Sequence, residues 1–126
     1  MLVALAGVGG ANLRIRLYKN NPTISDDTQL SDLTEADYDG YAPFSSAGWG
    51  GPTLDTNADE YLLSPVAVFQ KAAGSIPNTV YGYFVTIEGA GGSKLMGVEK
   101  FDTPQSMTAS TDQIPLRVKV ALRQVS

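Results

Sequence analysis

The chain has 126 residues with 13 glycines and 7 prolines, and 17% of its residues are charged, a composition typical of one β-rich globular domain with many turns. It contains no cysteine and no histidine, which excludes disulfides, thiolate metal sites and histidine general bases. The acidic residues are concentrated: residues 20–70 hold nine of the 13 and no Lys or Arg. This distribution predicts either a solvated acidic loop region or charge complementarity toward a neighbouring subunit.

Residues 1–12 open with an apolar run, MLVALA, that ends at Gly7. The run has no positively charged flank and is shorter than the apolar part of a signal peptide, and no stretch approaches the length of a transmembrane helix. We expect residues 1–12 to be an N-terminal arm or first strand and residues 13–126 to form the domain. An apolar arm needs a surface to pair with, so Leu2, Val3 and Leu5 are candidate contacts with another chain.

The first strand of the domain is predicted at residues 13–18, LRIRLY, where apolar residues alternate with Arg14 and Arg16. Asn20-Asn21-Pro22 ends it, and an acidic connection follows up to Asp39, with one helical turn at residues 33–36. A short strand is expected at residues 40–44. Residues 45–56 read as a loop, in which Trp49 is either an anchor folded onto the body or an exposed contact residue.

Two further strands are expected within residues 60–73, broken at Ser64-Pro65. Ala67, Phe69 and Lys71 share one face of the second of these strands, and Val66 and Val68 share the other.

The most strand-like stretch is Thr79–Glu88, TVYGYFVTIE, which carries apolar residues on both faces. Such a strand is usually central and covered on both sides. We expect the acidic connection and the Trp49 loop to supply most of the cover, and Gly82 to mark the close approach of an aromatic ring. Tyr81 and Tyr83 are expected to lie partly in a subunit contact.

The rest of the chain predicts a glycine loop at residues 89–93, a hairpin partner at 94–101, a weaker strand at 103–108 and a closing strand within 113–125. In the closing strand, Val118 and its apolar neighbours face inward, while Arg117 and Lys119 face outward. About eight short strands at this spacing predict an all-β fold, an antiparallel β-sandwich or jelly-roll-like single domain with long loops.

No stretch gives strong evidence for chemistry. The run Glu35-Ala-Asp37-Tyr-Asp39-Gly40 is similar to the front half of a calcium loop, but Ser46 stands where a bidentate Glu is needed, so we expect a hydrogen-bonded turn. The glycine-rich stretches at residues 7–10 and 89–92 are not followed by a helix and read as turns. The acidic residues could supply a carboxylate pair for a hydrolase, yet they lie mostly in polar loops that would not raise a pKa.

The basic residues form a second open question. If the first and last strands are neighbours, Arg14, Arg16, Arg117 and Lys119 form one basic patch. A sequence pI of about 4.6 argues against nucleic acid as its ligand. Polar edge-strand chemistry, or a contact with the acidic segment of another chain, are the alternatives.

Several stretches, taken in order, carry a resemblance: LRIRLYKNNPT (residues 13–23), LSDLTEADYDGYA (30–42), Trp49, TVYGYFVT (79–86), KFDTPQSM (100–107) and LRVKVAL (116–122). In this order they resemble the small virion structural proteins of tailed bacteriophages. Members of that family show a strand ending in Asn-Asn-Pro, an E-A-x-x-x-G-Y stretch and a V-Y-G-Y-Y-V-T strand. Phe84 departs from the pattern, because it stands where the family has the second of two adjacent tyrosines.

The resemblance implies a non-enzymatic virion structural protein without a cofactor, and a small β-sandwich suits a capsid cement or decoration protein on the capsid exterior. The implied partners are the major capsid protein and further copies of the chain (a trimer or dimer), not nucleic acid or a membrane. The alternatives are a tail, fibre or head–tail component, a carbohydrate-binding module that uses Trp49, Tyr41 and Tyr61, and a carboxylate hydrolase. The candidate subunit or capsid contacts are Leu2, Val3, Leu5, Arg14, Arg16, Asp37, Tyr41, Trp49, Tyr81, Tyr83, Arg117 and Lys119.

Overall fold

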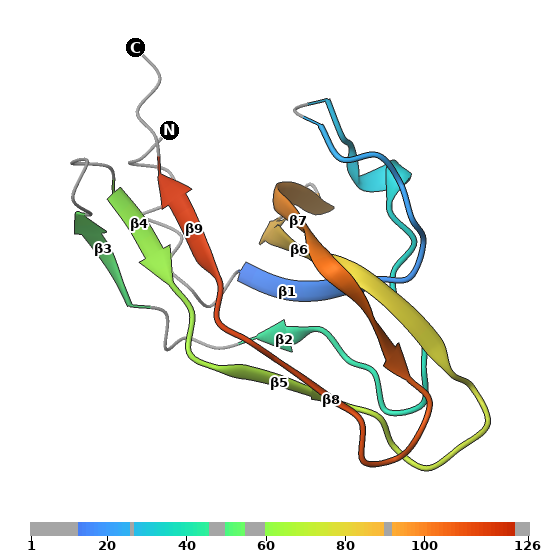
Figure 1. Cartoon of the computed structure of the whole chain (residues 1–126). Helices are drawn as coiled ribbons and strands as arrows, with labels where there is room; N and C mark the ends of the chain where they lie inside the picture. Colours follow the sequence, from blue (N-terminus) through green and yellow to red (C-terminus); the bar gives the residue numbers. More distant parts are fainter. Residues whose placement is uncertain (1–12, 26, 46–49, 55–59, 90–91, 123–126) are drawn as a thin grey trace.

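A computed structural model describes residues 13–25, 27–45, 50–54, 60–89 and 92–122, and for residues 50–54, 60–63 and 119–122 the description covers the backbone. These residues form nine strands and one short 3₁₀ helix, and every strand pairing is antiparallel (Figure 1). The prediction of an all-β antiparallel fold is therefore confirmed.

The largest sheet has four strands in the order β2-β1-β6-β7. Its two inner strands are β1 (Leu13–Tyr18) and β6 (Asn78–Gly89), and its edges are β2 (Phe44–Ser45) and β7 (Gly92–Met107). The predicted central strand lies within β6, which pairs with β1 on one side and with β7 on the other. Its burial follows from this position, since Val80, Phe84 and Val85 are each at most 2% exposed.

A long two-stranded ribbon forms the second part of the fold. Strand β5 (Ala67–Gln70) pairs with β8 (Gln113–Leu116), and the same two chain segments continue into β4 (Glu60–Leu63) and β9 (Lys119–Leu122), which pair with each other. Strand β3 (Gly50–Leu54) adds an edge to β4.

The ribbon is interrupted where the sequence predicts a break. Three residues, 64–66, lie opposite only two, Arg117 and Val118, so one strand carries one residue more than the other. Pro65 has no N–H to give to the ladder. Ser64 closes the gap instead: its N–H donates to the Val118 carbonyl at 2.8 Å, and its hydroxyl oxygen accepts from the Val118 N–H at 2.7 Å.

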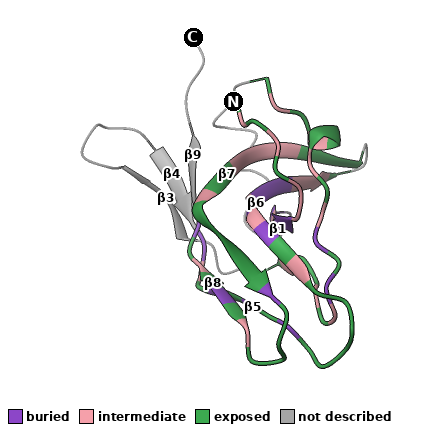
Figure 2. Cartoon of the chain, turned by 45° about the vertical axis from the view of Figure 1, so that its right-hand side comes forward, coloured by how far each residue is buried: buried purple, intermediate pink, exposed green. Residues whose placement is uncertain are grey.

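The core lies between the four-stranded sheet and the β5–β8 part of the ribbon (Figure 2). Its buried members are Leu13, Ile15, Leu17, Ala36, Tyr38, Ala67, Phe69, Val80, Val85, Met107, Ile114 and Val118. The alternation in β5 is as predicted, because Ala67 and Phe69 are buried and Val66 and Val68 are exposed. Val66 and Val68 leave an apolar outer face on the ribbon, with 57% and 52% of their surface exposed.

The opposite face of the four-stranded sheet is covered by the acidic connection. The 3₁₀ helix η2 (Leu30–Asp32) lies in it, and Leu30 and Leu33 face Phe84 and Thr86 across a small cavity. Phe84 and Thr86 are 2% and 0% exposed. The expectation that the chain itself covers both faces of β6 is confirmed for these residues, while the Trp49 loop lies outside the described residues.

Some element boundaries differ from the predictions. The short strand near residue 40 is instead a turn, with the Tyr41 N–H donating to the Tyr38 carbonyl at 3.0 Å, and the strand begins at Phe44, after Pro43. The helical turn lies at Leu30–Asp32, three residues earlier than expected. Residues 50–54, which were expected to be a loop, form β3. An edge strand with an irregular register tolerates its glycines and proline.

The C-terminal half also differs. The two predicted strands at 94–101 and 103–108 are one strand, β7, whose register with β6 is irregular between Val80 and Gly82. The single closing strand is divided into β8 and β9 at Arg117 and Val118, where the ribbon changes register.

Candidate functional site

The densest polar cluster centres on Arg16 in β1, on the sheet face that the acidic connection covers. One guanidinium nitrogen, Nη1, donates to both carboxylate oxygens of Glu35, at 3.1 and 3.0 Å. The other, Nη2, donates to Glu88 Oε1 at 3.1 Å, and Nε donates to Thr86 Oγ1 at 3.0 Å. Arg16 was a candidate contact with another chain, but it joins β1, β6 and the acidic connection within the subunit.

Tyr41 extends this cluster into the core. Its hydroxyl donates to Glu35 Oε2 at 2.6 Å and accepts from the Leu17 N–H at 3.2 Å. Its ring packs edge-on against Tyr38, with centroids 5.4 Å apart, and is stacked on Phe69 at 6.2 Å. Burial and the hydrogen bond to Glu35 raise the pKa of the Tyr41 hydroxyl. Tyr41 was a candidate contact and a candidate sugar platform, but the structure uses both its hydroxyl and its ring within the subunit.

Glu88 completes the cluster at the end of β6. Burial raises the pKa of its carboxyl, but hydrogen bonds from Ser93 and Thr86 and the charges of Arg16 and Arg14 outweigh this effect, so the pKa is lowered. A cavity of about 260 Å³ lies beside these residues and is lined by Arg16, Glu35 and mostly apolar or hydroxyl-bearing side chains. A carboxylate with a lowered pKa is suited to an ion pair and is not suited to donate a proton.

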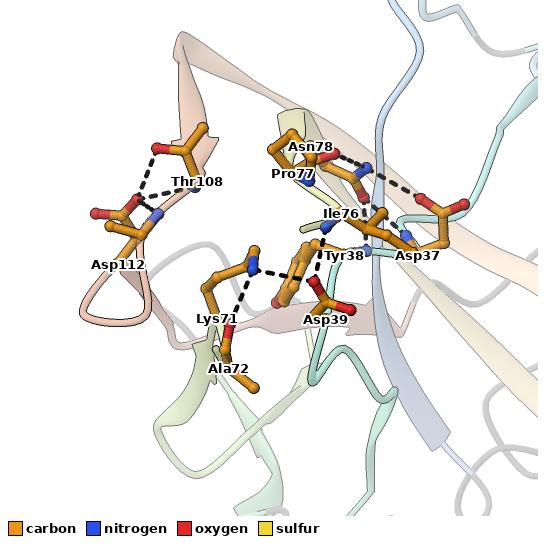
Figure 3. Close-up of polar contacts among 11 residues, drawn as sticks. Asp37, Tyr38, Asp39, Lys71, Ala72, Ile76, Pro77, Asn78, Thr108 and Asp112 are labelled. Atoms are coloured by element: carbon orange, nitrogen blue, oxygen red, sulfur yellow. Dashed lines mark hydrogen bonds and ion pairs between the residues drawn. The ribbon is translucent and has the colours of Figure 1, made fainter. Parts of the chain in front are cut away.

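The second polar cluster surrounds Lys71, whose side chain is only 1% exposed (Figure 3). Its Nζ donates to the Ala72 carbonyl at 2.8 Å and to Asp39 Oδ2 at 3.3 Å. Asp39 Oδ2 also accepts from the Ile76 N–H at 2.7 Å. This hydrogen bond, together with Lys71, lowers the pKa of Asp39. The cluster joins the turn at residues 38–41 to the loop that follows β5.

Two side-chain caps flank the Lys71 cluster in Figure 3. Asp112 Oδ2 accepts from the N–H groups of Thr108 and Ala109, at 2.9 and 2.8 Å, and these bonds lower the pKa of its carboxyl. On the other side, Asn78 Oδ1 accepts from the N–H groups of Asp37 and Tyr38, at 2.7 and 3.0 Å. Both arrangements hold loops in place through backbone N–H groups.

The carboxylates of the calcium-like run point to three different partners. Glu35 binds Arg16, Asp37 binds Lys19 at 2.8 Å, and Asp39 binds Lys71. Hydrogen bonds from Lys19 and Asn78 lower the pKa of Asp37. The predicted hydrogen-bonded turn is present at residues 38–41, with Gly40 at a φ of 87°. Within the described ranges, no group of three acidic residues is arranged to hold a metal ion.

These pairs also bear on the uneven charge distribution. Each joins an acidic residue of the 20–70 segment to a basic residue outside it, within one chain. At these positions the complementarity is therefore satisfied inside the subunit.

The condition for a single basic patch, that the first and last strands are neighbours, is not met. Strand β1 pairs with β2 and β6, whereas β9 pairs with β4 in a different sheet, so the first and last strands are not neighbours. Arg14 and Arg16 lie on a central strand, and Arg16 is ion-paired. Arg117 is exposed, and its Nε donates to the Ser64 carbonyl at 3.2 Å.

The other candidate contacts are dispersed. Tyr81 and Tyr83 are half-buried on β6, and the Tyr83 ring lies 6.2 Å from that of Phe101. The backbone of Lys119 pairs with Leu63. Leu2, Val3, Leu5 and Trp49 lie outside the described residues, as does the expected arm at residues 1–12. The described candidates do not converge on one surface.

The structure adds residues that the sequence analysis did not single out. Glu88 and Thr86 bind Arg16, yet they are 72 and 70 residues away from it along the chain, so only the β1–β6 register could reveal them. The burial of Lys71 could have been predicted from the sequence, because Lys71 lies on the same strand face as the apolar residues Ala67 and Phe69.

Taken together, the polar clusters described above tie strands and loops to one another. None of the helical segments in the described part of the chain could span a membrane. Comparison with protein families, with curated proteins and with solved structures finds no match to this chain.

Proposed function

We propose that this protein is a non-enzymatic structural protein of a tailed-bacteriophage virion. Within that class we propose a cement or decoration protein, which binds the major capsid protein on the outside of the capsid and stabilises it as a homo-oligomer. We further propose that the four-stranded sheet and the bent ribbon together form a small β-sandwich of the kind that the resemblance implies.

The observation that supports the proposal is that the motifs of the resemblance meet in one framework. Glu35 and Tyr41, from the E-A-x-x-x-G-Y stretch, hold Arg16 and the backbone of β1. Asn20, from Asn-Asn-Pro, donates to the Asp32 carbonyl at 2.8 Å and accepts from the Thr34 N–H at 2.9 Å. The third motif is β6 itself. The motif residues support one another in the fold, and this consistency favours reading their order in the sequence as one signature.

The alternatives have less support. Tyr41 is engaged inside the subunit, so it cannot serve as an exposed sugar platform. Glu35 and Glu88 are both ion-paired with Arg16, and the pKa of Glu88 is lowered, whereas a glycoside hydrolase needs one carboxyl whose pKa is raised. No observation on the described residues favours a tail or fibre role over a capsid role.

Immunogold labelling of particles of the phage that encodes the chain tests the proposed location. We expect gold over the whole head surface. Labelling confined to the tail or to one vertex would favour the tail or head–tail alternative, and unlabelled particles would contradict a virion role altogether.

A further inference from the structure

We propose that two copies of this chain pair edge to edge through β7, in an antiparallel arrangement about a two-fold axis at Gly97. The surface concerned is the outer edge of β7, and the partner is a second copy of the same chain. This inference deepens the proposed function, because it names the contact through which the homo-oligomer would form.

The free edge is the first observation. Strand β7 spans 16 residues at the margin of the four-stranded sheet, and β6 is the only strand in the described ranges that pairs with it (Figure 1). Its other edge therefore offers unpaired backbone N–H and C=O groups, which can be satisfied by adding a strand.

The second observation is a bulge that sets which side chains share a face. Val85 lies opposite Gly97 and Thr86 lies opposite Leu95, so Met96 is an extra residue without a partner on β6. Residues directly opposite each other in an antiparallel pair project from the same face. Because of the bulge, Lys94 and Glu99 project on the same face although they are five positions apart.

The cross-strand partners on β6 confirm this assignment. Lys94 lies opposite Ile87 and Glu99 lies opposite Tyr83, and both of these partners pack against the core. Leu95 and Val98 lie opposite Thr86 and Phe84, on the other face of the sheet.

The third observation is that this stretch is self-complementary. In the proposed pair, two β7 strands run antiparallel and Gly97 lies opposite Gly97 of the second copy. Met96 is left unpaired, as it is against β6. The next pair is therefore Val98 with Leu95 of the second copy, and the one after it is Glu99 with Lys94 of the second copy. Each pair matches in face, so one face gains two ion pairs and the other gains two apolar pairs. In the described part of the chain, neither the Lys94 ammonium nor the Glu99 carboxylate has an ion-pair partner, and both residues are exposed.

The space around this stretch is open. A Cβ built on Gly97 meets nothing within 4 Å. On the Leu95 and Val98 side, a groove of about 490 Å³ separates β7 from Ile24, Ser25 and Thr28. Leu95, Met96 and Val98 remain half-exposed beside that groove.

Charged residues and bulges on an edge strand also serve to block pairing. A single-cysteine experiment shows whether this edge forms the dimer or blocks pairing, and it is feasible because the chain has no cysteine of its own. In the purified full-length protein, Gly97→Cys places two thiols at the axis, within the reach of a disulfide. Ser106→Cys is the matched control on the same strand, about 30 Å from the axis at the usual rise of a strand.

We expect Gly97→Cys to form a covalent dimer under mild oxidation, at least tenfold faster than Ser106→Cys, and the unmodified protein to sediment as a dimer. A monomer, or equal cross-linking of the two variants, would overturn the proposal. Charge exchange tests the register: Lys94→Glu and Glu99→Lys should each weaken the dimer at least tenfold, and the double exchange should restore it to within about threefold. A double variant as weak as the single ones would also overturn it.

These measurements use the isolated protein and are independent of the virion. A dimer that is absent from phage particles would uphold the pairing and contradict the proposed function. A monomer that decorates the capsid would contradict the pairing and uphold the virion role.

Discussion

Gly82 and Tyr18 lie directly opposite each other on β6 and β1, and the tyrosine side chain fills the space where any other residue at position 82 would place its Cβ. A Cβ built on Gly82 would lie 2.6 Å from Tyr18 Cζ and closer still to the tyrosine hydroxyl and to the Glu99 carbonyl. The Tyr18 hydroxyl donates to that same carbonyl at 3.1 Å. The predicted close approach of an aromatic ring at Gly82 is confirmed, and the ring comes from the neighbouring strand.

We therefore expect Gly82→Ala to destabilise the protein, because the new methyl group collides with backbone and with a buried ring. Overpacking of this kind costs about 1–3 kcal/mol or more. The measurement is the free energy of unfolding in urea, with Gly89→Ala as the control, since a Cβ at Gly89 meets nothing within 4 Å. Equal stabilities of the two variants would contradict this packing.

The Tyr41 hydroxyl gives a second prediction. Tyr41→Phe removes the acceptor of the Leu17 N–H and the donor to Glu35, and leaving such buried groups unpaired costs about 1–3 kcal/mol. Tyr81→Phe is the matched control, because its hydroxyl makes no hydrogen bond to the described residues, and surface changes of this kind stay within about 0.5 kcal/mol. If both variants unfold at the same urea concentration, the hydrogen bonds assigned to Tyr41 do not contribute to the stability of the fold.

The Tyr38 hydroxyl behaves in the opposite way. It is buried and has no hydrogen-bond partner among the described residues, and burial raises its pKa to about 12. Tyr38→Phe should therefore stabilise the protein at neutral pH, by about 1 kcal/mol, because an unsatisfied polar group is removed. A loss of stability in thermal or urea unfolding would show that the hydroxyl has a partner after all.

Tyr18 and Tyr38 also predict how stability changes at high pH. Both have a pKa of about 12 in the folded protein, against 10.0 for the ordinary group. Above pH 10 the unfolded chain loses these protons while the folded chain retains them. The free energy of unfolding is therefore at its full value with respect to these two groups below pH 10, and it falls as the pH rises toward 12. Urea unfolding between pH 8 and 12 tests this, and the fall should be shallower in Tyr38→Phe. A flat profile would mean that neither group is buried as described.

The Lys71–Asp39 pair predicts an asymmetry between its two partners. Asp39→Asn removes the ion-pair partner of the buried Lys71 ammonium and leaves it only the more distant charge of Asp112, and breaking a buried pair in this way costs about 3–5 kcal/mol. Lys71→Met removes the buried charge itself, and Asp39 keeps the hydrogen bond from Ile76 and partial access to water. We expect Asp39→Asn to be the more destabilising change, and Lys71→Met to rescue it in the double variant. Equal losses of stability in the two single variants, or a double variant no more stable than Asp39→Asn, would contradict a buried charge at Lys71.

The sequence could predict the features that depend on residues close together along the chain. The alternation in residues 13–18, the two apolar faces of Thr79–Glu88 and the break at Ser64-Pro65 are all local patterns, and each is found in the structure. Strand β3 was missed because its glycines and proline are typical of a loop, and only its pairing with β4 makes it a strand.

The polar clusters could not be predicted in the same way. The partners of Arg16 come together only through the β1–β6 register and the return of the acidic connection over the sheet. The sheet order also separates β1 from β9, so the condition for a single basic patch is not met. The bulge at Met96 is likewise visible only in the pairing of β6 with β7, and it places Lys94 and Glu99 on the same face of the sheet.

The number of copies per particle tests the proposed function most directly. Particles of the phage that encodes the chain can be purified and the protein quantified against the major capsid protein, on a stained gel or by mass spectrometry with labelled standards. A cement protein must be present in hundreds of copies, in a fixed ratio to the major capsid protein. A handful of copies, or none, would contradict the account.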